Sequence, residues 1–230
     1  MFPVSGVLHI LSTPIGNLED ITFRAVRVLK EVGIIAAEDT RHTKRLLSHF
    51  DIHTPLTSYH DFNKEEKVPV LIERLKMGAS VALVTDAGTP TISDPGYYLI
   101  NAAINAGVGV SPVPGPTAVI AALSISGLPT DRFVFEGFFP RKKGARNKRL
   151  ESLKSEGRTL IFFESPHRIG SVLAEIRDVL GERRVVIARE MTKVYEETLR
   201  GTLSEVIHAM NGRTIRGEIT LIVEGDRRLK

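Results

Sequence analysis

Short, almost continuous apolar runs recur along this chain of 230 residues. Runs of this kind are typical of strands that are buried on both faces of a largely parallel sheet. They alternate with stretches in which apolar residues return every three or four positions, which is typical of a helix with one buried face. The alternation predicts an α/β fold with helices on both faces of the sheet. The predicted strands are Val7–Leu11, Ile34–Ala37, Val81–Val84, Leu160–Phe163, Val185–Ala188 and Ile219–Val223.

Helical spacing is clearest in three segments. Apolar residues fall at helical positions in residues 21–32 and 68–75, and they form the cleanest apolar stripe in residues 169–180. Gly181 follows that stripe directly and is a candidate C-cap, because glycine reaches the backbone conformation that ends a helix without strain.

Three prolines in five residues, Pro112, Pro114 and Pro116, divide the chain into similar halves. Proline donates no ladder hydrogen bond, so this stretch does not continue a central strand. We therefore predict two α/β domains, residues 1–115 and 116–230, with a cleft between them. We expect a mostly parallel sheet in the first and a mixed sheet in the second, where Glu196–Thr202 and Ile219–Val223 follow Val185–Ala188 with little helix between them.

The loops that follow the predicted strands are the candidate binding site, because open α/β sheets bind ligands at the carboxyl ends of their strands. Four of these loops are rich in Gly, Pro, Ser, Thr and Asp, which bring backbone amides close to a ligand. For any single loop a plain turn or cap is the better interpretation, but four such loops at one sheet edge predict a small-molecule site. The loops cover residues 12–18, 38–41, 85–96 and, after a strand at Gly107–Val110, 112–118.

Known phosphate-binding motifs are missing from these loops. The first strand is not followed by Gly-x-Gly-x-x-Gly, and the chain has no Gly-Lys-Ser/Thr loop. A nucleoside-type ligand without phosphates therefore fits the loops better than a nucleotide does.

Composition removes several classes of protein. The chain has no cysteine, which excludes disulfides, thiolate catalysis and sulfur-ligated metals and makes the cytoplasm the expected compartment. No apolar run approaches the ~20 residues that span a bilayer. Four histidines lie between residues 42 and 60, but no thiol accompanies them, so we expect no metal.

Net charge is +4, and it is concentrated in one segment. Six cations and no acid lie between Arg141 and Arg149, in a segment that follows Phe138-Phe139-Pro140. Phosphate-binding cations beside stacking aromatics suit single-stranded RNA, so we interpret this segment as a mobile RNA-binding loop. The alternative is a solvated loop that enters a helix with Leu150 and Leu153 inward.

Six motifs stand in order along the chain. They are Thr13-Pro14-Ile15-Gly16-Asn17-Leu18-Glu19-Asp20, Glu38-Asp39-Thr40-Arg41, Asp86-Ala87-Gly88-Thr89-Pro90, Ser93-Asp94-Pro95-Gly96, Gly115-Pro116-Thr117-Ala118 and Glu164-Ser165-Pro166-His167-Arg168. Together they resemble the tetrapyrrole-methylase-like superfamily and, within it, the bacterial 16S rRNA (cytidine-2′-O)-methyltransferases. The resemblance covers essentially the whole chain.

This resemblance implies a homodimer that uses S-adenosylmethionine to methylate the ribose 2′-oxygen of a cytidine in the decoding region of 16S rRNA, within the small ribosomal subunit. It places the cofactor in the cleft between the two domains. The implied cofactor contacts are Pro14, Asp86, Gly88, Thr89, Pro90, Ile92, Ser93, Thr117, Ala118, Phe163, Ile219 and Thr220.

Methyl transfer to a hydroxyl benefits from a base that accepts the hydroxyl proton. Carboxylates at strand ends are the candidates, namely Glu38, Asp39, Asp86 and Glu164. We favour Glu38 or Asp39 because Arg41, Lys44 and Arg45 lie beside them to meet a phosphate, although Asp39 reads equally as a helix cap. The full set of expected RNA contacts is Arg41, Lys44, Arg45, Arg141, Lys142, Lys143, Arg146, His167 and Arg168.

Two other functions stay open on the sequence. A methylase of a tetrapyrrole or another small substrate fits the same loops but has little use for the cations at 141–149. A non-catalytic RNA-binding module would use the same cleft only structurally.

Overall fold

The computed structural model describes residues 6–226 and contains two β-sheets. The chain divides into two compact units between Thr117 and Ala118. The boundary predicted at residues 115/116 lies two residues earlier. The outermost parts of the two predicted domains, residues 1–5 and 227–230, lie outside the described residues.

Unit 1 contains a five-stranded sheet in the order β3-β2-β4-β1-β5, in which every strand pair is parallel. Its strands are β1 (Val7–Leu11), β2 (Ile34–Ala37), β3 (Leu56–Ser58), β4 (Val81–Val84) and β5 (Gly109–Val113). Its helices are the short 3-10 helix η1 (Leu18–Asp20), α1 (Phe23–Glu31), α2 (Thr40–His49), α3 (Lys64–Lys76) and α4 (Tyr97–Asn105).

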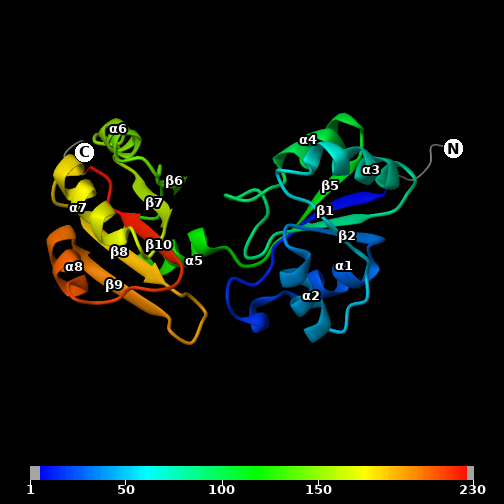
Figure 1. The fold of residues 1–230 in the computed structure, drawn as a ribbon, viewed down its shortest axis with the longest axis horizontal. Helices are drawn as coiled ribbons and strands as arrows, with labels where there is room; N and C mark the ends of the chain where they lie inside the picture. The colour runs from blue at the N-terminus through cyan, green and yellow to red at the C-terminus, as the bar shows by residue number, and fades with distance from the viewer. Residues whose placement is uncertain (1–5, 227–230) are drawn as a thin grey trace. The chain divides into compact units, whose positions relative to one another are not determined.

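Helices cover both faces of this sheet (Figure 1). Side chains alternate between faces along a strand, so Leu11 of β1 packs with Leu29 of α1 and Leu47 of α2, whereas Leu8 packs with Leu75 of α3 and Leu99 of α4. Two apolar layers therefore enclose a sheet whose strands read as continuous apolar runs.

The sequence analysis predicted that the proline-rich stretch does not continue a strand. The structure differs at Pro112. Pro112 lies inside β5 and is paired with Ile10 of β1. Only one side of β5 is bonded because it is an edge strand, and proline is tolerated there. The strand expected at Gly107–Val110 therefore begins and ends later, at Gly109–Val113.

Unit 2 contains a mixed sheet in the order β6-β7-β10-β8-β9. β10 runs antiparallel to both neighbours, β8 and β9 are also antiparallel, and β6 and β7 are parallel. The strands are β6 (Phe133–Phe138), β7 (Thr159–Glu164), β8 (Arg184–Arg189), β9 (Glu197–Thr202) and β10 (Ile219–Val223). The antiparallel pairing expected at one edge thus extends to the central strand.

Four helices pack on the second sheet. The core on one face is formed with α6 (Lys143–Ser152), α7 (Ile169–Leu180) and α8 (Leu203–Met210). In Figure 1, α5 (Ala118–Ser126) lies on the other side of this sheet, where it contacts β10 and β8. α7 matches the predicted helix, and its C-cap Gly181 has φ +78°, a conformation that glycine adopts without strain.

The structure therefore contains one all-parallel sheet and one mixed sheet, as the sequence predicts. The pattern did not predict β6, α4 or α8, and α6 replaces most of the expected mobile loop. Among the described residues, no helix has the length and apolar character needed to cross a membrane.

Candidate functional site

The loops at the carboxyl edge of the first sheet are joined to one another. Thr13, after β1, exchanges two backbone hydrogen bonds with Gly88, after β4, at N–O distances of 2.9 and 3.0 Å. The amide of Ser12 donates to the carbonyl of Val113 at the end of β5. Loops that are distant in sequence therefore form one continuous surface, as the sequence predicts for this sheet edge.

Ser12 also links the loops through its side chain. Its hydroxyl lies 2.8 Å from that of Thr89, and the Thr89 hydroxyl lies 3.4 Å from the carbonyl oxygen of Pro116. Gly115 approaches Ser12 so closely that a Cβ on residue 115 would lie 3.0 Å from the Ser12 Cβ. The small side chains at this edge are therefore needed for the loops to meet, and they leave backbone groups near the surface.

A second set of contacts joins the ends of β2 and β4. The Thr85 hydroxyl donates to Glu38 Oε2 at 2.6 Å, and the amide of Asp39 donates to Asp86 Oδ1 at 3.1 Å. Carboxylates from two strand ends thus face the same small region of unit 1.

Residues 85–96 follow an unusual backbone path. Thr91 has φ +76° and Ser93 has φ +69°, in the left-handed region that side chains other than glycine rarely adopt. Gly96, with φ +147°, could not carry a side chain because its Cβ would lie 2.7 Å from Thr91 Cγ2. Backbone strain of this kind tends to be retained at functional sites.

Asp94 lies in this strained loop, and its carboxyl is perturbed. Burial and then the nearby charge of Glu38 raise the pKa of Asp94 to about 6. Burial also raises the pKa of Asp86 above its ordinary value. A carboxyl with a pKa near the working pH is suited to accept a proton. The sequence analysis places Asp94 in a motif but does not single it out as a candidate base, because the residue type gives no sign of its burial.

Asp39 makes the contacts of a helix cap, which is the alternative that the sequence left open. Its carboxylate caps α2 by accepting from the Arg41 amide at 2.8 Å, and it forms an ion pair with the Arg41 guanidinium at 2.7 Å. These hydrogen bonds hold the pKa of Asp39 well below its usual range. The carboxylate is therefore a poor proton acceptor, and the capping alternative is the one observed.

The cofactor contacts expected in unit 1 gather around the joined loops. Gly88 and Pro90 are buried, whereas Ile92 and Ser93 are exposed on the 85–96 loop. The remaining positions, Pro14, Asp86, Thr89 and Thr117, are half-buried. With their backbone groups and short side chains, these loops fit a nucleoside-type ligand, because Gly88 and Gly115 leave the loops without side chains where they meet.

Unit 2 brings together some of the other expected positions. Phe163 of β7 and Thr220 of β10 are register partners, on the face opposite the core formed with α6, α7 and α8. Ile219 points the other way and is 3% exposed within that core, so its side chain does not reach the same face. Ala118 is half-buried at the start of α5.

The Glu164-Ser165-Pro166-His167-Arg168 motif contains a buried ion pair. The Glu164 side chain is fully buried, and its Oε1 lies 2.6 Å from Nη2 of Arg168. This pairing favours a structural role for both residues, because a buried carboxylate requires a partner. His167 is exposed beside them.

Arg146 is not available as the RNA contact that the sequence predicts. Its guanidinium, 7% exposed, makes a two-pronged ion pair with Glu175 and donates to the carbonyls of Pro140 and Arg141. An RNA phosphate would have to displace this buried carboxylate. Phe139 is likewise buried and stacks on Phe162 at 4.0 Å, so of the two rings before the basic segment Phe138 is the exposed one.

The remaining expected RNA contacts are at the surface. Arg141, Lys142 and Lys143 are exposed at the start of α6, and Arg41, Lys44 and Arg45 are exposed on α2. Arg149 pairs with Glu136 at 2.6 Å. Within residues 6–226, no group of three or more histidine or acidic side chains is arranged to hold a metal ion.

Comparison with known proteins gives the class of protein. Residues 7–207 match the family model of the tetrapyrrole (corrin/porphyrin) methylases, so the chain belongs to this methyltransferase family. A solved structure with the same fold is a uroporphyrin-III C-methyl transferase from Thermus thermophilus, in complex with S-adenosyl homocysteine. It is 22% identical with a TM-score of 0.64, and the match covers 98% of this chain and 100% of that chain.

Closer relatives define a particular branch of the family. The chain is 56% identical over 221 residues to a protein of Halalkalibacterium halodurans named "Ribosomal RNA small subunit methyltransferase I", a match that covers 96% of this chain and 76% of the relative. A protein of the same name from Vibrio cholerae is 53% identical, with 96% of this chain and 78% of the relative covered.

Proposed function

We propose that this protein transfers a methyl group from S-adenosylmethionine to the ribose 2′-oxygen of a cytidine in 16S rRNA. The observation that carries the proposal is the identity of 56% to a ribosomal RNA small subunit methyltransferase I over 96% of the chain. The joined loops of unit 1 support it, because they provide the backbone-lined edge that a nucleoside-type methyl donor needs.

Backbone groups of the 12–18 and 85–96 loops would hold the donor. S-Adenosylmethionine supplies a methyl group that is bonded to a positively charged sulfur. The sulfur departs as a neutral thioether and needs no acid to protonate it. The task of the protein is therefore to orient the donor and the acceptor, which contributes about 7–11 kcal/mol when both are well placed. We expect Gly88 and Thr89 to contact the methyl donor most directly.

Asp94 is the group best suited to receive the ribose hydroxyl proton. Its pKa of about 6 leaves most of the carboxylate ionised at neutral pH, whereas Asp39 is held in a helix cap. Glu38 already accepts a hydrogen bond from Thr85, and its charge raises the pKa of Asp94. We therefore replace the pair Glu38 and Asp39 with Asp94 as the base and give Glu38 a supporting role.

Exposed cations would hold the RNA backbone. The exposed side chains at the start of α6 are Arg141, Lys142 and Lys143. Arg146, in contrast, is buried in an ion pair with Glu175 and does not present its charge to the surface. Arg41, Lys44 and Arg45 of α2 lie next to the carboxyl edge of β2. We propose that the substrate is the small ribosomal subunit in the cytoplasm and that the enzyme acts as a homodimer.

Incubation with methyl-labelled donor and small ribosomal subunits tests the proposal. We expect label in 16S rRNA, and mass mapping of the digested RNA should locate it on the ribose of one cytidine. Label on a base, or no label with either subunits or naked RNA, would contradict the proposal. Heat of donor binding without transfer to any RNA would favour a small-molecule methylase, and no heat at all would favour a binding module.

A further inference from the structure

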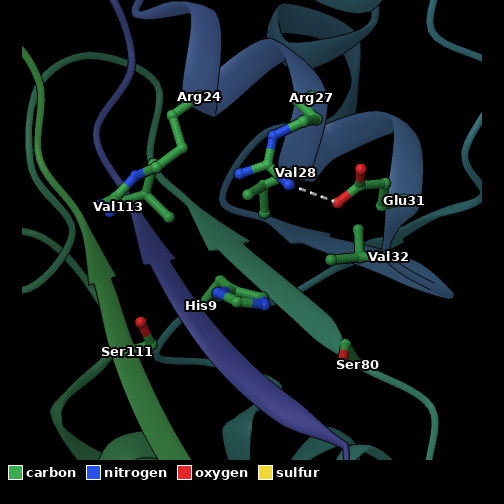
Figure 2. A pocket seen from close by; sticks show the side chains of 9 residues that line it. All are labelled: His9, Arg24, Arg27, Val28, Glu31, Val32, Ser80, Ser111 and Val113. Carbon is green, nitrogen blue, oxygen red and sulfur yellow. Dashed lines mark hydrogen bonds and ion pairs between the residues drawn. The ribbon is translucent and has the colours of Figure 1, made fainter.

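A pocket of about 250 Å³ lies on the face of the first sheet that carries α1, and it extends from that helix to the edge strand β5 (Figure 2). Among its lining residues, Val113 is the one that also belongs to the loops of the candidate functional site. Period-two alternation puts His9 on the same face as the buried Leu11, and Ser111 on the same face as the buried Val113. Polar side chains thus occupy positions where the pattern of the sheet calls for apolar ones.

The lining is rich in hydrogen-bond donors. Nη2 of Arg24 donates to the carbonyl of Pro112 at 2.7 Å, which holds the side chain across the pocket from α1 to β5. That bond uses one of the five N–H groups of the guanidinium. Ser80 accepts from the amide of Val7 through its hydroxyl oxygen, and its own proton is free to donate.

Charge in the pocket is positive. The carboxylate of Glu31 is the acidic group of the lining, and it lies 3.0 Å from the guanidinium of Arg27. Arg27 therefore neutralises Glu31, as the dashed line in Figure 2 shows, and Arg24 gives the pocket a net charge of +1.

His9 adds an unsatisfied group. Its Nδ1 is buried and has no hydrogen-bond partner among the described residues. Burial, followed by the charges of Arg24 and Arg27, lowers the pKa of His9, against the opposing effect of Glu31. Buried polar atoms are nearly always hydrogen-bonded, so an orphaned nitrogen beside two arginines indicates a missing partner.

We propose that this pocket binds a phosphate group, held by the charge of Arg24, with the remaining N–H groups of Arg27 and the side chains of His9 and Ser111 completing its hydrogen bonds. Guanidinium groups match phosphate oxygens in geometry and charge. The volume corresponds to about eight water molecules at ~30 Å³ each, enough for a phosphate and part of an attached group. The proposal does not depend on the methyltransferase function, since the pocket would take either free phosphate or a phosphodiester of RNA.

Nuclear magnetic resonance of protein labelled in its histidines tests the proposal. Inorganic phosphate should shift the His9 ring signals with saturation and raise the pKa of His9, because a bound anion stabilises the imidazolium. A short single-stranded RNA without terminal phosphates forms the second arm. A response to RNA alone assigns the site to a phosphodiester, and a response to phosphate alone assigns it to a free or terminal phosphate.

Variants separate a specific pocket from general attraction. Arg24→Gln should weaken binding at least about tenfold, as expected for the loss of a charge-assisted contact. Lys30→Gln is the matched control, since it removes the same charge from α1 at a position outside the lining. Ser111→Ala provides a second test should Arg24→Gln fail to fold. No saturable shift with either ligand, or equal weakening in Arg24→Gln and Lys30→Gln, would overturn the proposal.

Discussion

The hydroxyl of Thr85 donates a 2.6 Å hydrogen bond to Glu38, joining residues 47 positions apart at the ends of two neighbouring strands. This bond holds the Glu38 carboxylate beside the strained 85–96 loop, where its charge acts on Asp94. Burial is the main cause of the raised pKa of Asp94, and the charge of Glu38 raises it further, which is a common way to prepare a base for neutral pH.

Replacement of Asp94 by asparagine should lower the rate of methyl transfer by about 10²–10⁴-fold, because it removes a proton acceptor in the transition state. The wild-type rate should rise with pH through about 6, and the variant should lose that dependence. Single-turnover rates between pH 5 and 8 measure this. Asp61→Asn, which removes an exposed carboxylate at the same sheet edge, is the matched control. A pH profile in Asp94→Asn that matches wild type would exclude Asp94 as the base.

The same substitution should affect stability in the opposite sense. The pKa of Asp94 is higher in the folded protein than its ordinary 3.8, so the folded state holds the proton more tightly. The contribution of this carboxyl to stability is therefore full below about pH 4 and is lost as the pH rises through about 6. Asp94→Asn should unfold at a higher temperature than wild type at pH 8, and the difference should vanish near pH 4. Thermal unfolding at both pH values checks the sign.

Substitution of Gly115 by alanine should destabilise unit 1 by about 1–3 kcal/mol, the usual cost of forcing extra atoms into a packed site. The new Cβ would lie 3.0 Å from the Cβ of Ser12 and push the two loops apart. Binding of S-adenosylmethionine, measured by calorimetry, should weaken with it. Gly109→Ala is the matched control, because nothing lies within 4 Å of the Cβ position there. Equal effects of the two substitutions would disprove the role of the Gly115–Ser12 contact.

Loss of the Arg146 side chain should act on stability. Arg146→Gln leaves the Glu175 carboxylate, 12% exposed, without its partner, and breaking a buried ion pair costs about 3–5 kcal/mol. Urea unfolding should reveal this loss, whereas Lys148→Gln, two positions further along α6 and exposed, should change stability little. Unchanged stability in Arg146→Gln would return this residue to the list of possible RNA contacts.

Neutralising Arg141, Lys142 and Lys143 together should weaken RNA binding and flatten its dependence on salt. Each lost phosphate contact on a single strand lowers the slope of log affinity against log salt by about 0.7, so the triple variant should lose about 2. Fluorescence titrations at several salt concentrations give the slope, and calorimetry should give an unchanged affinity for S-adenosylmethionine. Lys30, Arg74 and Lys76, also exposed, form a control triple of equal charge. The same slope in both triple variants would rule out the α6 contact.

Much of the fold follows from the hydrophobic pattern. The six predicted strands are present because both faces of each sheet are covered, which makes their sequences almost continuously apolar. β6 was not predicted because its residues are only partly buried and alternate weakly, and β3 has just three residues. Pro112 lies in a strand because β5 is bonded on one side only, which is a property of the whole sheet.

The site was predictable to the extent that strand ends meet at one edge. The sequence therefore identified the loops at Ser12, Glu38, Asp86 and Gly115 as neighbours, and their hydrogen bonds join them. It did not distinguish the roles of charged side chains. Arg146 and Lys142 look alike in a basic segment, but the pairing of Arg146 depends on Glu175, which is distant in sequence. Burial likewise separates Asp94 from Asp39, two carboxylates that the residue type alone treats as equal.

The two backbone hydrogen bonds between Thr13 and Gly88 join the loops that follow β1 and β4. Because these bonds order the loops when the chain folds, the loops lose little further conformational entropy when a ligand binds. Amide hydrogens of these two residues should then exchange with solvent only as unit 1 opens as a whole. The binding loops at this edge are therefore preorganised, and ligand binding should require little rearrangement of their backbone.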